Sequence, residues 1–159
     1  TPASAPSAPA SNSYAQIVVD QHNAHRLNHS APAAAWSQAL ADTAMQIAQT
    51  CSYGHSMNVN GGNYGQNIAA GAPVSGIGSV ITEQFYNGEV NDFVDYGQPT
   101  PADFEQSFET YGHFTQVVWV GSTAVGCASF DCSKQGLANV ASNVPPIFHV
   151  CNYQPAGKF

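Results

Sequence analysis

The fold is constrained most by the order of two hydrophobic patterns along the chain, one typical of helices and one typical of strands. Apolar residues recur every three to four positions over 14–27, 36–51 and 79–90, which predicts three helices. Near the end, TAVGCASF at 123–130 and IFHVCNY at 147–153 are short and bounded by Gly and Pro, which indicates strands. Helices first and strands last are typical of an α+β domain.

Local signals refine this expectation. Ser13 and Ser37 precede the first two predicted helices and are suited to cap them, whereas Gly88 weakens the third helix near its end. The stretch at 53–65 is so rich in Gly and Asn that we expect a loop there. HFTQVVW at 113–119 fits a short helix or a strand, and both alternatives stay open.

Size and charge limit the possible partners. The chain has 159 residues, which suits one domain, and its 3 Lys and Arg stand against 10 Asp and Glu for a net charge of -7. Without a basic patch, the chain is not suited to bind nucleic acid or anionic lipid headgroups. We therefore expect any bound lipid to be held by apolar contacts.

Several features point to the secretory pathway. Residues 1–13 are rich in Pro, Ala and Ser, which predicts a disordered tail. The chain lacks an initiator Met, a signal h-region and an apolar run of the roughly 18–20 residues that cross a bilayer, so we interpret it as a processed mature chain. The 4 Cys and the glycosylation sequon at Asn28 agree with an extracellular protein that contains disulfides.

An acidic segment with interleaved rings is a candidate lipid site. Between Glu83 and Glu109 lie seven of the 10 acidic residues and no Lys or Arg, and the interleaved rings are Phe85, Tyr86, Phe93, Tyr96, Phe104 and Phe108. These rings either border an apolar groove or mobile lid, or cap the core beneath a long loop. The acidic residues are interpreted as a solvated face, with weak capture of Mg²⁺ or Ca²⁺ as a lesser alternative.

Three histidines share one stretch that begins in the first predicted helix and ends just beyond it. His22, His25 and His29 have helical spacing that can mimic a set of metal ligands, but no carboxylate or Cys completes the set. We therefore predict an exposed polar helix face.

Three ordered motifs carry a resemblance to a known family. GHFTQVVW at 112–119, VGCASF at 125–130 and HVCNYQPAG at 149–157 are similar to the GHYTQVVW, GC and CNYxPxGN signatures of the CAP superfamily. This superfamily comprises cysteine-rich secretory proteins, antigen five and plant pathogenesis-related class one proteins. Residues 35–36, 51–56 and 64–68 resemble its PxLxW, CxxxHS and YGENLA elements, and the chain is most similar to the small single-domain secreted type of fungi and plants.

The resemblance implies a three-layer α-β-α sandwich with a mainly antiparallel central sheet, formed by a CAP domain at 14–159. It also implies a cleft with two His and two Glu, which map to His55, His113, Glu89 and, as a departure, Gln66. Two imidazoles and a carboxylate suit Zn²⁺ or Mg²⁺, whereas each His alone would be interpreted as an ordinary polar residue. Because Gln66 removes a charge, we expect a weakened metal site.

The same resemblance implies the disulfides Cys51–Cys132 and Cys127–Cys151 and a function. Some CAP members bind sterols or fatty acids, so the leading expectation is a secreted, monomeric protein that sequesters or exports such lipids in host interaction or defence. One alternative is a module that engages a cell-surface, host or cell-wall receptor. Another is a metal-dependent hydrolase in which Glu89 activates a metal-bound water. Since the chain lacks a GxSxG elbow and an HExxH helix, a non-enzymatic role is favoured.

Overall fold

The structure is a computed structural model that describes residues 13–93 and 104–157, with the backbone alone for 104–109. The helices and strands in chain order are α1 (Tyr14–Asn28), β1 (Ala35–Trp36), α2 (Gln38–Ala48), η1 (Val59–Gly61), β2 (Gly65–Ala70), η2 (Val74–Gly76), α3 (Ile77–Ser79), η3 (Val80–Asn87), α4 (Phe104–Val117), β3 (Ala124–Asp131) and β4 (Ile147–Gln154). In the described part, no helix is long and apolar enough to span a bilayer.

The predicted helices begin at the residues expected to cap them. The Ser13 side chain accepts a hydrogen bond from the Gln16 amide, and the Ser37 side chain accepts one from the Leu40 amide. Each hydroxyl satisfies a backbone donor that has no partner within its own helix. Ser13 therefore belongs to the folded domain rather than to the predicted tail, whose residues 1–12 lie outside the described residues.

The third predicted helix and the ambiguous HFTQVVW segment both form helical structure. α3 continues directly into η3, a π-helix that ends just before Gly88. HFTQVVW lies in and just beyond the last turns of α4, which ends at Val117, so the helical alternative holds.

The strands form a four-stranded sheet in the order β1-β3-β4-β2. β4 pairs antiparallel with both β2 and β3, whereas the short β1 pairs parallel with β3. The sheet is therefore mixed and mostly antiparallel, and β2 lies at one of its edges.

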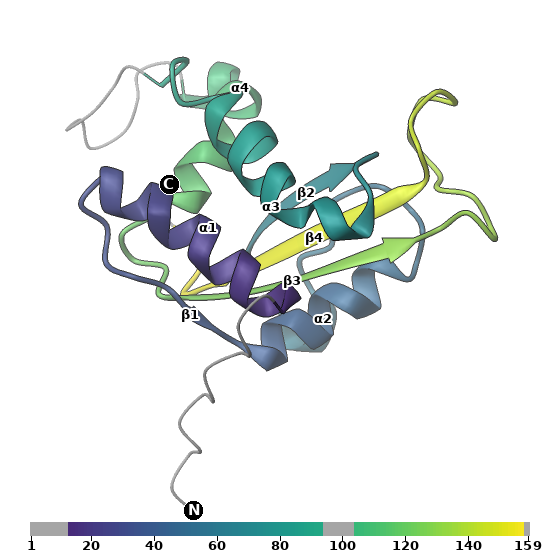
Figure 1. The fold of residues 1–159 in the computed structure, drawn as a ribbon, viewed down its shortest axis with the longest axis horizontal. Coiled ribbons are helices and arrows are strands. Elements are labelled where there is room, and N and C mark those ends of the chain that lie inside the picture. The colour runs from purple at the N-terminus through teal and green to yellow at the C-terminus, as the bar shows by residue number, and fades with distance from the viewer. Residues whose placement is uncertain (1–12, 94–103, 158–159) are drawn as a thin grey trace, which may run out of the picture.

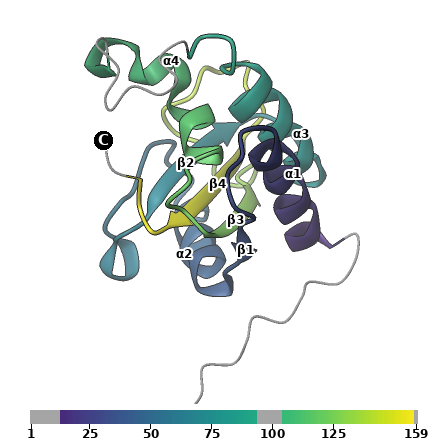
Figure 2. The same cartoon turned by 90° about the vertical axis from the view of Figure 1, so that its left-hand side faces the viewer.

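Helices cover both faces of the sheet, which confirms the α+β three-layer sandwich (Figures 1 and 2). One core lies between the sheet and α1, α3, η3 and α4, and includes Val18, Ile81, Phe85, Val117, Val125 and Tyr153. The other lies between the sheet and α2, and includes Leu40, Ile47, Ile68, Phe148 and Val150. α2 approaches β3 closely at Gly126, where an added Cβ would lie 2.5 Å from the carbonyl oxygen of Ser37. Glycine is required at this contact.

Two disulfides join the last strands to each other and to the end of α2. Cys127 and Cys151 lie directly opposite each other on β3 and β4, with Cα atoms 4.1 Å apart. Cys51 and Cys132 are 81 residues apart in sequence, with Cα atoms 5.7 Å apart. These are the pairs that the resemblance implies, and no described cysteine is free.

The buried face of α1 differs from the predicted one. His22 and Arg26 are each only 1% exposed and His25 is also buried, whereas Leu27 is 78% exposed. The prediction of an exposed polar histidine face is therefore wrong for His22 and His25. The polar groups tolerate burial because they are hydrogen-bonded: His22 Nδ1 donates to the Val18 carbonyl (2.8 Å), and Nε2 accepts from the Tyr153 hydroxyl (2.8 Å).

We expect the titration of His22 to destabilise the fold in mild acid. Burial lowers the pKa of His22 to about 4 from the model-peptide value of 6.5. Below pH 6.5 the unfolded chain binds a proton that folded His22 does not, so stability falls as the pH drops from about 6.5 to about 4. The expected loss is about 3 kcal/mol, measured by urea unfolding across this range. A His22→Gln variant should show a shallower pH dependence, and an unchanged slope would contradict this assignment.

Candidate functional site

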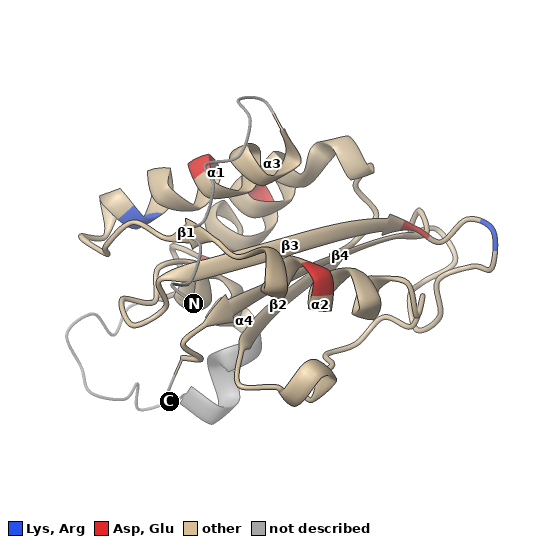
Figure 3. Ribbon diagram, turned by 90° about the horizontal axis from the view of Figure 1, so that it is seen from below, with Lys and Arg blue, Asp and Glu red and all other residues tan. Residues whose placement is uncertain are grey.

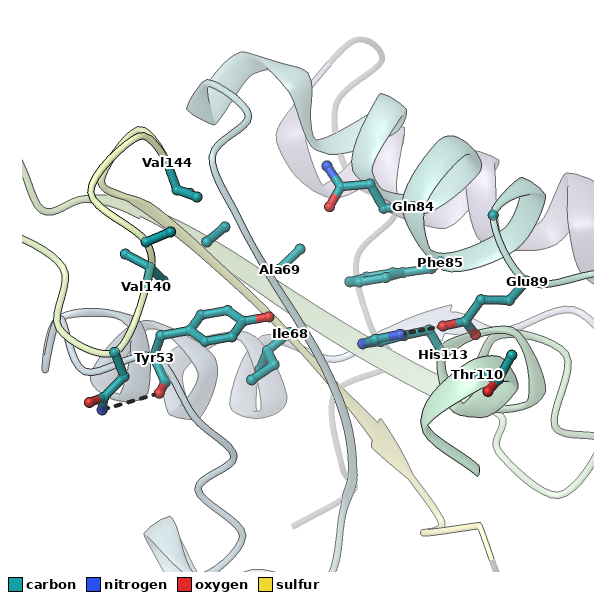
Figure 4. Close-up of a pocket in the computed structure, with 14 residues that line it drawn as sticks. Tyr53, Ile68, Ala69, Gln84, Phe85, Glu89, Thr110, His113, Val140 and Val144 are labelled. Carbon is teal, nitrogen blue, oxygen red and sulfur yellow. Dashed lines mark hydrogen bonds and ion pairs between the residues drawn. The ribbon is translucent and has the colours of Figure 1, made fainter. Parts of the chain in front are cut away.

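His113 and Glu89 form one half of the candidate site. His113 lies in α4 and Glu89 two residues beyond η3, and His113 Nδ1 donates to Glu89 Oε1 at 2.7 Å. The other carboxylate oxygen accepts from the Phe114 amide at 2.8 Å. The Phe85 ring stacks on His113 with centroids 5.1 Å apart and planes 9° apart (Figure 4). In the neutral imidazole with its proton on Nδ1, Nε2 of His113 keeps its lone pair.

His55 and Gln66 form the other half. Gln66 Oε1 accepts from His55 Nδ1 at 3.1 Å and from the Ser56 amide at 3.0 Å. Its amide nitrogen donates to the Ser56 carbonyl at 3.2 Å and to Asn152 Oδ1 at 2.9 Å. Gln66 therefore uses both amide protons and orients His55 in the way that Glu89 orients His113.

Strand β2 separates the two pairs. Gln66 and Asn67 are neighbours in β2, so their side chains point to opposite faces of the sheet. Asn67 Nδ2 donates to the His113 carbonyl (3.1 Å) and to the Tyr153 hydroxyl (3.2 Å). This buried network reaches His22 through Tyr153, and the sequence motifs gave no indication of it.

A cavity of about 570 Å³ lies beside this strand, with one pair in its wall. His113, Glu89 and Phe85 line it on one side, and Tyr53, Val140 and Val144 on the other (Figure 4). His55 and Gln66 do not line this cavity. The four residues of the implied tetrad are thus present as two hydrogen-bonded pairs, of which one borders the cavity.

The donor set does not fit a metal site with three protein ligands. Among the residues that the structure describes, no group of three or more His, Cys, Asp or Glu side chains is placed to hold an ion. Each imidazole keeps Nε2 for a ligand, but Glu89 and Gln66 are engaged in orienting the imidazoles. Of these four residues, the two imidazoles alone keep a nitrogen for a metal, fewer than the three protein ligands that catalytic zinc sites use.

Replacing Gln66 by Glu is expected to destabilise the fold. A carboxylate would face the Ser56 carbonyl and Asn152 Oδ1 without a proton to donate, and unsatisfied buried acceptors cost about 1–3 kcal/mol. Urea unfolding of the Gln66→Glu variant tests this at pH 7. Isothermal titration with Zn²⁺, with His113→Ala as the control, tests whether the added charge tightens metal binding. A stable variant with tighter Zn²⁺ binding would show that position 66 faces the metal rather than the amide partners.

The rings of the acidic segment pack on other rings where they are described. Phe85 is buried, and the Tyr86 ring stacks on His25 with centroids 3.9 Å apart. Phe93 contacts Tyr111 and Phe114 edge-on or tilted. Tyr96 lies outside the described residues, as do the side chains of Phe104 and Phe108, whose backbone belongs to α4. Of the three described rings, Phe85 alone lines the cavity beside β2.

A second cavity, which the sequence did not indicate, lies at the start of α1. It has a volume of about 670 Å³ and is lined by Tyr14, Ile17, Pro73, Val74, Ser75, Ile77, Asp131 and Ile147. The Tyr14 hydroxyl bonds Ser129 Oγ at 2.7 Å, which ties the start of α1 to β3. Burial raises the pKa of Tyr14, so this side chain stays neutral.

Comparison with known sequences decides the family. The model of the cysteine-rich secretory protein family matches residues 19–153, which is most of the chain. The chain belongs to the CAP family. Its sheet and its two disulfides lie within the matched range apart from the last residue of β4, and its motifs do so apart from residues 154–157.

Several fungal proteins and solved structures are similar to this CAP chain. A "Probable pathogenesis-related protein" of Arthroderma benhamiae is 42% identical over 146 residues, covering 91% of the chain but 45% of the relative. "Fruiting body protein SC7" of Schizophyllum commune is 33% identical, covering 90% of the chain and 67% of the relative. The chain thus spans less than half of the first relative.

A structural comparison agrees on the fold. The crystal structure of NaASP2 with Zn²⁺ superposes with a TM-score of 0.70 at 22% identity, covering 89% of the chain and 79% of that structure. At this identity the similarity extends to the fold alone. The Zn²⁺ belongs to that protein and is not carried over to the present chain.

Proposed function

We propose that this CAP chain is a secreted lipid-binding protein that takes up one sterol or fatty acid, with a sterol preferred. The cavity at the start of α1 carries the proposal, because its volume of about 670 Å³ lies within the roughly 300–1,000 Å³ typical of ligand pockets. Secretion is supported by the two disulfides and by relatives such as "Secreted protein RBT4" of Candida albicans.

The lining of this cavity suits an apolar ligand. Six of its eight lining residues, Tyr14, Ile17, Pro73, Val74, Ile77 and Ile147, present apolar surface. The Tyr14 hydroxyl is engaged with Ser129, so the ring contributes mainly its carbon atoms. Burial of apolar ligand surface against these side chains would supply most of the affinity.

The polar groups of the lining favour a sterol over a fatty acid. The lining contains two polar residues, Ser75 and Asp131, and no Lys, Arg or His. Hydrogen bonds from Ser133 lower the pKa of Asp131, so its carboxylate is ionised near neutral pH. A carboxylate accepts a hydrogen bond from a sterol hydroxyl, whereas it repels the carboxylate of a fatty acid.

The lipid location that we propose differs from the one expected from the ring-rich segment. Phe85, Tyr86 and Phe93 pack on neighbouring rings, as expected for aromatic residues that cap a core. The cavity at the start of α1 provides an apolar wall that does not depend on these three rings.

A matched pair of substitutions tests this location. Val74 is 39% exposed in η2 and lines the cavity, whereas Val120 is 60% exposed in the loop after α4 and does not line it. Val74→Asp places a charge on the apolar wall and is expected to weaken binding of a fluorescent sterol at least about tenfold, or about 1.4 kcal/mol. Val120→Asp should leave the affinity unchanged. Equal affinities of the two variants, with melting temperatures unchanged, would contradict the assignment.

A further inference from the structure

Strand β2 has one row of backbone groups that faces away from the sheet. The Gly71 amide donates to the Ile147 carbonyl at 3.0 Å. This bond shows which alternate residues of β2 are hydrogen-bonded to β4 in the antiparallel ladder. Backbone groups along a strand point alternately to its two sides. Gly65, Asn67 and Ala69 therefore bond β4, whereas the amides and carbonyls of Gln66, Ile68 and Ala70 point to the open edge.

The alternation in the adjoining ladder agrees with this assignment. The Cys132 amide donates to the Pro146 carbonyl at 2.7 Å, so the even-numbered residues of β4 face β3. The odd-numbered residues of β4 are left to face β2, where they pair with Gly65, Asn67 and Ala69.

The outward groups lack protein partners although their residues are largely buried. Within the described part of the chain, the backbone amides and carbonyls of Gln66, Ile68 and Ala70 make no hydrogen bond on the side that faces away from β4. Gln66 is 8% exposed and Ile68 5% exposed. Sheet edges of this kind are templates for pairing with another strand.

The cavity beside β2 lies against this edge. Ile68, Ala69 and Ala70 all line it, although successive side chains of a strand point to opposite faces. Three consecutive residues border one cavity when that cavity faces the edge of the strand. Figure 4 shows Ile68 and Ala69 between a wall with Tyr53, Val140 and Val144 and a wall with Phe85, Glu89 and His113.

We propose that the open edge of β2 binds an extended peptide as a fifth strand of the sheet. Pairing along Gln66–Ala70 engages a peptide of about five residues, at about 3.3 Å per residue. The three outward amides and carbonyls supply the main-chain hydrogen bonds, and the two walls receive alternate side chains. The cavity beside β2 and the cavity at the start of α1 share no lining residue, so the peptide site and the sterol cavity are separate.

Charge selects the class of peptide. The chain carries a net charge of -7, and the ionisable side chains in the cavity lining are Glu89, His113 and Tyr53, with no Lys or Arg. The partner is therefore a neutral or basic segment rich in β-branched residues, since acidic segments are repelled and β-branched residues favour extended backbone.

Amide hydrogen exchange with a defined peptide tests the proposal. The probe is the acetylated and amidated peptide Thr-Val-Lys-Val-Thr at millimolar concentration with ¹⁵N-labelled protein. We expect exchange to slow at least about tenfold at the amides of Gln66, Ile68 and Ala70, and little change at Asn67 and Ala69, whose amides already bond β4. The same peptide N-methylated at every residue should give no protection.

Other results would overturn the proposal. One is the absence of saturable protection, and another is equal protection by the N-methylated peptide. A third is protection of the edge that rises with protein concentration in the absence of peptide, which would indicate that a second copy of the chain binds there. Ala70→Pro removes an outward amide but no sheet hydrogen bond and should abolish protection at Ile68, whereas Ala70→Ser should retain it. If Ala70→Pro fails to fold, the wild-type exchange pattern decides. Sterol affinity should be unaffected by the peptide, which keeps this test independent of lipid binding.

Discussion

Replacing Arg26 by Met is expected to lower the free energy of unfolding by about 4 kcal/mol. The guanidinium donates to the carbonyls of Pro32 (2.8 Å), Val117 (3.0 Å), Trp119 (2.9 Å) and Ser122 (2.6 Å). Arg26 is 1% exposed, so the variant removes the donor from the buried carbonyls of Val117 and Ser122, at about 1–3 kcal/mol each, whereas the Trp119 carbonyl keeps the Ser122 amide as a donor. These bonds join α1 to the end of α4, the helix that carries His113.

Thermal and urea unfolding measure this effect. A loss of this size should lower the melting temperature by about 10 °C in a chain of this length. Lys134→Met is the matched control, because Lys134 is an exposed cation whose removal should have little effect. Figure 3 shows how sparsely Lys, Arg, Asp and Glu residues are distributed over the ribbon. A change below about 1 kcal/mol for Arg26→Met would show that water replaces the guanidinium at no cost.

Removing the Cys51–Cys132 disulfide is expected to destabilise the protein more than removing Cys127–Cys151. The two bonds close sequence separations of 81 and 24 residues. The loop-entropy relation gives about 4.5 kcal/mol for the longer loop and about 3.5 kcal/mol for the shorter one. Both pairs are buried, so the order of the two losses follows from loop length.

Urea unfolding of the two double Cys→Ala variants tests this order. Peptide mass spectrometry of the wild-type chain should find no free thiol and should link Cys51 to Cys132. A crosslink from Cys51 to Cys127, or a smaller loss for the longer loop, would contradict the prediction.

Most of the helices and the last two strands could be predicted because their signals are local. Ser13 and Ser37 cap α1 and α2, and β3 and β4 coincide with short apolar segments bounded by Gly and Pro. β2 could not be predicted in this way, since GQNIAA contains a single β-branched residue. Its strand conformation comes from pairing with β4, a contact between residues distant in sequence.

Burial along α1 could not be predicted for a different reason. Arg26 is buried because backbone carbonyls from a segment about ninety residues later receive its donors, while Leu27 points to solvent. Periodicity describes which residues share a helix face, but it does not say which distant groups meet that face.

The candidate site was predicted in part. The motifs assigned His55, His113, Glu89 and Gln66 to one cleft, and the hydrogen bonds of the structure join them as two pairs. The motifs did not show that Gln66 uses its amide protons on Ser56 and Asn152. They also did not indicate the cavity at the start of α1, which is assembled from α1, η2, α3, β3 and β4 together with Pro73.

Equilibrium titration of the delipidated protein with a fluorescent sterol is the most direct test of the proposed function. The proposal predicts saturable uptake of one sterol per chain, weaker uptake of a fluorescent fatty acid, and little change on addition of moderate salt, because apolar burial supplies the affinity. Absence of saturable uptake of either lipid, or uptake that moderate salt abolishes, would contradict it.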